Sequence, residues 1–253
     1  MMPEFMVAGL WGLVSGSGLL VGATIADAFF GRLTHRMIAA IMGFGGGVLI
    51  AVVATELIGE RHPAGLGPLA ILALLAGAAI FSGNNWYLAR RGAKHRKRCG
   101  ECTEQPSERQ HQGSGTAIAL GSVLDGIPEA LVIGMSVAGG GKISLAVVAG
   151  FFLANVPQGL SSASGMKLAG RSRRYIYAVW IGIPVLVCIA AGAGNFVLGS
   201  AETLAPAILS FAAGAVIAML AETMIPEAFE KAPPFIGLIT VMGFLAAYLL
   251  AQH

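Results

Sequence analysis

Residues 117–138 read AIALGSVLDGIPEALVIGMSVA, a long apolar run that carries two carboxylates in its interior. About 20 predominantly apolar residues are enough for a helix to cross the hydrocarbon core of a bilayer. Asp125 and Glu129 are four residues apart, so a helix places both carboxylates on one face. The stretch therefore predicts a membrane-spanning helix with a polar site inside it.

Other apolar runs of similar length occupy most of the chain, and we expect an all-α, polytopic membrane protein. Of the 253 residues, 56% are hydrophobic and only 11% are charged, whereas soluble domains are about 25% charged. This composition excludes a soluble globule, a disordered chain and a disulfide scaffold. The runs are too long for outer-membrane strands of about 10 residues. The eight expected spans are 5–30, 37–58, 67–89, 117–138, 143–166, 175–199, 203–226 and 234–251.

The basic residues predict the orientation of these spans. Of the 16 Lys and Arg residues, 14 fall in the loops after spans 1, 3, 5 and 7, and only Arg61 and Lys142 fall on the other side. Basic residues accumulate in cytoplasmic loops. We therefore expect a cell-membrane protein with both termini outside.

The chain divides into spans 1–3 (1–89), a polar cytoplasmic loop (90–115) and spans 4–8 (116–253). The loop contains Cys99 and Cys102 in a CxxC pattern, flanked by His95 and His111. These four side chains could hold zinc, or the cysteines are reduced thiols without a structural role. The basic run 90–98 suits an anchor at anionic lipid, and we expect no nucleic-acid partner.

Spans 2 and 7 resemble each other. FGGGVLIAVVATELIGE (Phe44–Glu60) and FAAGAVIAMLAETMIPE (Phe211–Glu227) share seven identical positions in 17 at an offset of 167. The two spans run in opposite directions across the membrane, so a repeat here is inverted, as in many secondary transporters. The alternative is that two helices rich in Gly and Ala match through composition alone.

A cation site is predicted where spans 4 and 5 meet. A charged side chain at mid-membrane is costly and usually faces a polar cavity, and Asp125 and Glu129 lie near the middle of span 4. Pro128 leaves the carbonyl of Leu124 without its helical donor. Carboxylate and carbonyl oxygens suit hard cations.

Span 5 offers a matching set of polar groups. Asn155 and Gln158 are three residues apart, so they share a face near mid-span, and Pro157 frees the carbonyl of Leu153. Consecutive spans joined by a short loop are expected to be antiparallel neighbours. The alternative to a cation site is that these polar groups only bond to each other.

Three more acidic residues lie inside spans. Glu56, at the outer end of span 2, and Glu222, toward the cytoplasmic end of span 7, could line a cation pathway. They could equally be solvated carboxylates at helix ends. We expect Asp27, near the inner end of span 1, to be structural.

These features resemble the ZIP (Zrt/Irt-like) family of divalent-metal transporters, and the resemblance covers nearly the whole chain. In that family span 4 carries His-Asn-x-Pro-Glu-Gly, and span 5 carries a similar His/Gln-Asn/Asp-x-Pro-Glu-Gly. Here span 4 reads DGIPEA (125–130), and span 5 reads ANVPQG (154–159). The end of span 7, ETMIPE (222–227), matches the family's Met-x-Pro-Glu type of ending.

The resemblance implies an eight-helix bundle arranged 3+2+3, with an inverted repeat, a metal site at mid-membrane and a homodimer. Asp125 replaces the family's His, Ala154 the first ligand of span 5, and Gln158 the Glu. The matching set is Asp125, Glu129, Asn155 and Gln158, which has no imidazole. We expect one metal ion at most, with a preference for Mn²⁺, Fe²⁺ or another hard cation, although zinc also accepts carboxylates.

We therefore expect a transporter that moves a divalent metal into the cytoplasm, with no tightly bound cofactor and no enzymatic activity. One alternative is a protein of this fold that has lost metal transport and carries another solute or acts as a sensor. Another is an intramembrane enzyme that uses Asp125 and Glu129 as acid and base, but no nucleophile motif accompanies them.

Overall fold

The computed structural model describes residues 2–29, 32, 34–59, 65–93, 114–138, 144–198, 202–230 and 233–251. Within these ranges, every element of regular structure is a helix. The elements are α1 (Glu4–Ala28), α2 (His35–Val52), η1 (Val53–Gly59), α3 (Pro68–Leu88), η2 (Ala89–Ala93), α4 (Ser114–Ser136), α5 (Leu145–Leu168), α6 (Arg173–Leu198), η4 (Glu202–Leu204), α7 (Ala205–Met219), η5 (Leu220–Met224), α8 (Ile225–Glu230) and α9 (Ile236–Ala251).

Local capping explains where several helices begin. The side chain of Thr34 accepts a hydrogen bond from the amide of Met37 at the start of α2, and Ser144 does the same for Val147 at the start of α5. Pro68 occupies the first turn of α3, where a missing amide hydrogen costs nothing. The segments η1, η2 and η5 are π-helical continuations of α2, α3 and α7.

Among the described residues, seven continuous helices are long and apolar enough to cross a membrane, as expected of a multi-pass membrane protein. They correspond to the first seven predicted spans. The eighth, α9, is an apolar helix of 16 residues, about 24 Å long at 1.5 Å per residue. At the two ends of the predicted loop 90–115, helical structure continues through Ala93 and resumes at Ser114.

Large apolar side chains cover the outside of the bundle. Leu72 on α3, Phe196 on α6 and Leu238 on α9 are 65%, 76% and 60% exposed, respectively. Water would make such a surface prone to association, whereas lipid tails suit it. The exposed side chains thus support the assignment to a membrane.

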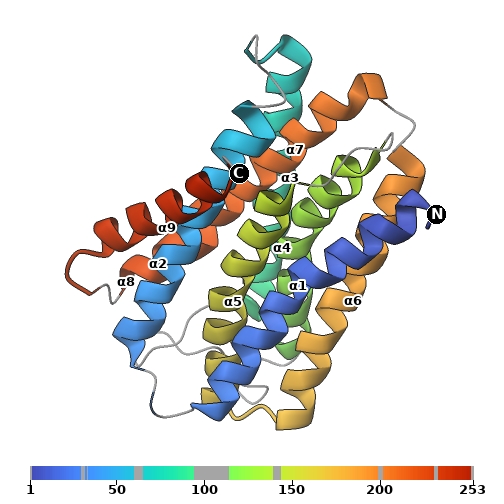
Figure 1. Cartoon of the computed structure of the whole chain (residues 1–253). Helices are drawn as coiled ribbons and strands as arrows, with labels where there is room; N and C mark the ends of the chain where they lie inside the picture. The colour runs from blue at the N-terminus through green and yellow to red at the C-terminus, as the bar shows by residue number, and fades with distance from the viewer. Residues whose placement is uncertain are drawn as a thin grey trace.

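The helices form two groups that meet along α4 and α5 (Figure 1). In one group, α1 packs on α5 and α6, and α4 packs on α6. In the other group, α2 packs on α9, and α3 packs on α7. Contacts of α2 with α5 and of α4 with α7 join the groups.

The pairs α2–α9 and α3–α7 are built from equivalent glycines. A Cβ on Gly47 would collide with the carbonyl of Thr240, and a Cβ on Gly214 would collide with the carbonyl of Leu74. In the reverse direction, Gly243 lies against the carbonyl of Phe44, and Gly77 lies against the carbonyl of Phe211. Glycine allows such close backbone approach, so both pairs are held by two glycines at one crossing.

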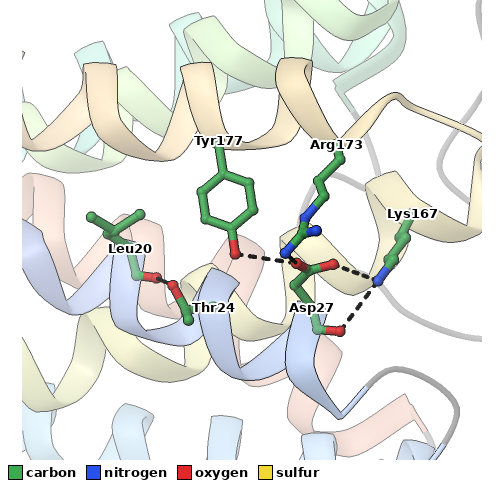
Figure 2. Close-up of polar contacts among 6 residues, drawn as sticks. All are labelled: Leu20, Thr24, Asp27, Lys167, Arg173 and Tyr177. Carbon is green, nitrogen blue, oxygen red and sulfur yellow. Dashed lines mark hydrogen bonds and ion pairs between the residues drawn. The ribbon is translucent and has the colours of Figure 1, made fainter.

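One end of the first helix group is held by a cluster around Asp27 (Figure 2). Its carboxylate oxygens lie 2.6 Å from Nζ of Lys167 on α5 and 2.7 Å from the guanidinium of Arg173 on α6. The hydroxyl of Tyr177 donates to Oδ2 at 3.2 Å. This end, where α1 and α5 end and α6 begins, is called the Asp27 end below. The cluster agrees with a structural role for Asp27.

The glycine contacts predict a stability difference between two positions on α3. Gly77→Ala forces α3 away from the carbonyl of Phe211 and should cost about 1–3 kcal/mol, the usual range for an overpacked core. Gly83→Ala is the matched control, because a Cβ at Gly83 meets nothing within 4 Å. It should be neutral or slightly stabilising. Thermal unfolding in detergent measures both, and equal midpoints would contradict the role of the crossing.

The Asp27 cluster predicts a second stability effect. Asp27→Asn removes the charge that holds Lys167 and Arg173, and should cost about 1.5–3 kcal/mol, the range for hydrogen bonds to charged groups. Glu4→Gln, at the exposed start of α1, is the control. The loss should shrink in high salt, because the side chain of Arg173 is 75% exposed. A salt-independent loss would argue against an ionic cause.

Candidate functional site

The two carboxylates of α4 are buried in the middle of the bundle. Asp125 is 3% exposed and Glu129 is 1% exposed. Asp125 lies 11 residues after the start of α4, about 16 Å along its axis. Pro128 lies between them inside the helix. Two like charges at this depth coexist only if a proton or a cation is shared between them.

Asn155 of α5 is hydrogen-bonded to one member of this pair, Glu129. Its Nδ2 donates to Oε2 of Glu129 at 2.8 Å and to the backbone oxygen of Ser15 on α1 at 3.3 Å. Both N–H groups of the amide are thus used. The amide oxygen therefore points away from Glu129 and Ser15. One side chain therefore connects α1, α4 and α5.

Glycines bring α1 and α5 close enough for this arrangement. A Cβ on Gly18 would lie 3.0 Å from the Cβ of Asn155, and it would collide with the carbonyl of Phe152. Gly22 and Gly159 likewise leave no room for a side chain against the facing backbone. The position of Asn155 thus depends on small residues that carry no polar group themselves.

A small cavity lies beside the pair. Its free volume, about 10 Å³, is close to the lower limit for one water molecule. Three of the predicted site residues, Asp125, Asn155 and Gln158, line it. The other lining residues are Leu19, Ser122, Gly126, Ser162 and Trp180.

Two buried nitrogen atoms at this cavity have no hydrogen-bond partner among the described residues. They are Nε2 of Gln158 and Nε1 of Trp180. A carboxamide can present either its oxygen or its nitrogen, so Gln158 can turn its oxygen toward a cation. The indole of Trp180 is only a donor.

The donor set consists of oxygens from carboxylates, amides and hydroxyls. Within the described ranges, no group of three His, Cys, Asp or Glu side chains could hold a metal ion. Any metal at this cavity would therefore depend on two carboxylates, with amide and hydroxyl oxygens completing its ligands. Such a set suits a hard cation that is bound weakly and released.

The two predicted pathway residues lie outside the lining of this cavity. Glu56 lies in η1 and is 7% exposed, so it is buried rather than solvated. Glu222 lies in η5, where Ser82 donates to Oε1 and Asn85 donates to Oε2, the latter at 2.6 Å. Both π-helical segments thus carry one of these carboxylates. Single π-helical turns occur often at functional sites.

Sequence reasoning missed three polar residues of the cavity. Ser122 lies three residues before Asp125, and Ser162 lies four residues after Gln158, so helical spacing could have identified both. Trp180 had no such signal, because it comes from α6, outside the two spans that carry the motif. The CxxC pattern with Cys99 and Cys102 lies outside the described residues.

No protein-family model matches this chain, and no curated protein matches it either. The resemblance to ZIP transporters therefore stays a prediction from the sequence motifs in spans 4, 5 and 7.

The bond between Asn155 and Glu129 predicts a stability effect. Asn155→Ala removes the donor from a buried carboxylate and should cost about 1–3 kcal/mol. Asn84→Ala is the control, because Asn84 is exposed on α3 and its side chain donates to the carbonyl of Ile80 in the same helix. A double-mutant cycle with Glu129→Ala, which removes the accepting oxygen, isolates the pair. A coupling energy near zero would show that the contact contributes nothing.

Proposed function

We propose that this protein transports a divalent metal cation across the cell membrane into the cytoplasm. The observation that carries the proposal is that Asp125, Asn155 and Gln158 line one small cavity, and that Glu129 is hydrogen-bonded to Asn155. They come from two adjacent helices in a bundle suited to a membrane. Isolated carboxylates are rarely retained at such depth without a function.

The four residues have different roles in replacing the water molecules bound to the cation. Asp125 and Glu129 supply negative charge, and Gln158 and Asn155 supply neutral oxygens. Because the nitrogen of Asn155 is held by Glu129 and Ser15, its oxygen is the atom available as a ligand. Because this set has two carboxylates and no imidazole, Mn²⁺ and Fe²⁺ are the favoured cargo. Zn²⁺ is a second candidate, since zinc also accepts carboxylate ligands.

The architecture proposed is the ZIP-like 3+2+3 bundle, with spans 1–3 and 6–8 as an inverted repeat around spans 4 and 5. Two observations support the repeat. Gly47 and Gly214 are related by the offset of 167, as are Phe44 and Phe211, and all four lie at the glycine crossings. The π-helical segments η1 and η5 begin at Val53 and Leu220, which differ by the same 167.

Transport then follows from relative movement of the two helix groups. The residues that line the cavity lie on α1, α4, α5 and α6, and α4 and α5 are the helices that contact the second group. A shift of the second group against α4 and α5 would open the cavity to one side and then the other. Glu56 and Glu222, in the π-helical segments of the second group, would attract cations at the two ends of the path. Both termini are proposed to lie outside, and the protein is proposed to be a homodimer.

The second candidate is a protein of this fold that senses a metal or carries another solute. The observation that favours it is the lack, within the described ranges, of three clustered His, Cys, Asp or Glu side chains. Metal uptake by the wild type would exclude it.

The test is uptake of Zn²⁺, Mn²⁺, Fe²⁺, Co²⁺ and Cd²⁺ into proteoliposomes. Glu129→Gln keeps the shape and the oxygen that accepts from Asn155, but removes the charge. It should slow uptake about 10–100-fold, as loss of metal-site groups usually does. Asp125→Asn should act similarly, and Glu4→Gln should match the wild type.

Two results would overturn the proposal in different ways. A folded wild type that takes up none of the five metals would not be a metal transporter, and the second candidate would then stand. Uptake that both Glu129→Gln and Asp125→Asn leave unchanged would place the pathway elsewhere in the bundle.

A further inference from the structure

Trp180 lies between the carboxylate site and the Asp27 end of the bundle. It follows Arg173, which binds Asp27, by seven residues, about 10 Å along α6. Gly126 packs against the side chain of Val187, so Asp125 is level with a position six residues, about 9 Å, beyond Trp180. A cation that leaves Asp125 toward the Asp27 end must therefore pass the level of the indole.

The indole of Trp180 is part of the wall of the cavity. It is 1% exposed and among the largest fully buried side chains in the described residues. Its N–H is a buried donor without a protein partner in the described residues. Tryptophan N–H groups usually find a partner when they are buried, and the cavity is the place where a water or a hydrated cation can supply one.

The backbone at Trp180 is less constrained than in the rest of α6. Pro184 lies four residues later, inside the helix, and a proline cannot donate to the carbonyl of the residue four before it. Gly182 lies between them, and a Cβ there would meet nothing within 4 Å. This turn of α6 therefore lacks one helical hydrogen bond and has space on one side.

We propose that Trp180 is the seal that closes the cation cavity toward the Asp27 end, and that its indole must move before the cation leaves. The inference rests on the proposed transport function and adds the residue that controls exit from the site. With the indole in its wall, the cavity has a free volume of about 10 Å³, enough for about one water and too little for a hydrated cation. In this proposal the N–H of Trp180, which has no partner among the described residues, would donate to the water that accompanies the cation.

Thiol labelling tests the seal without any metal. Ser122→Cys, in a background where Cys99, Cys102 and Cys188 are serine, reports access to the cavity beyond Trp180. A small cationic thiol reagent is supplied from one side of the bilayer at a time. Trp180→Ala should raise the labelling rate of this reporter about tenfold or more from the Asp27 end alone.

Two controls accompany this measurement. Trp86→Ala removes the same residue type from an exposed position on α3, and it should leave the rate unchanged. The labelling rate of the reporter Ser136→Cys, at the opposite end of α4, should not change with Trp180→Ala. Trp180→Phe and Trp180→Leu, which retain more volume and are safer for folding, should give rates in the order Trp, Phe, Leu, Ala from slowest to fastest.

Labelling rates that do not follow the size of residue 180, or that rise equally with Trp86→Ala, would overturn the seal. The result is independent of the uptake assay. A protein that transports metal but shows no effect at Trp180 loses only the seal. A protein that shows the size order but takes up none of the metals keeps a closed cavity and loses the proposed cargo.

Discussion

The arrangement of the inner helices depends on the cost of placing charge where water is absent. Asp125 and Glu129 lie on one face of α4, and both are almost fully buried. Lipid tails supply no hydrogen bonds, so neighbouring helices must supply polar partners. Asn155 of α5 bonds to Glu129, and a backbone oxygen of α1 holds the same amide. The positions of α1, α4 and α5 are thus linked through a single side chain.

This requirement is satisfied only because the backbones come unusually close. Apolar surfaces gain little by meeting each other in lipid, so packing between small residues has to hold helices together. Gly18, Gly22 and Gly159 do this between α1 and α5, beside the cavity. Gly47, Gly77, Gly214 and Gly243 do it at the two crossings of the second group. The buried polar site and the close glycine contacts therefore depend on each other.

Much of the fold could be predicted from the apolar runs, because hydrocarbon thickness imposes a minimum length on each span. Seven predicted spans are helices of spanning length, and the eighth, α9, is shorter. The π-helical segments η1 and η5 were not predicted, because spans 2 and 7 are apolar on nearly every side and an extra residue in one turn leaves no visible mark in such a run. The low exposure of Glu56 was not predicted, because a sequence does not show which neighbouring helices cover the end of a span.

The candidate site, too, could be predicted only in part from the sequence. The sequence by itself determined that Asp125 and Glu129 share one face, and that Asn155 and Gln158 share another, because helical periodicity depends only on spacing. It also determined that these residues lie deep in their spans. Only the tertiary structure decided that Asn155 donates to Glu129, and that Gln158, Ser122, Ser162 and Trp180 surround one cavity. Those contacts join residues from different helices, and their distances depend on how closely glycines allow the backbones to approach.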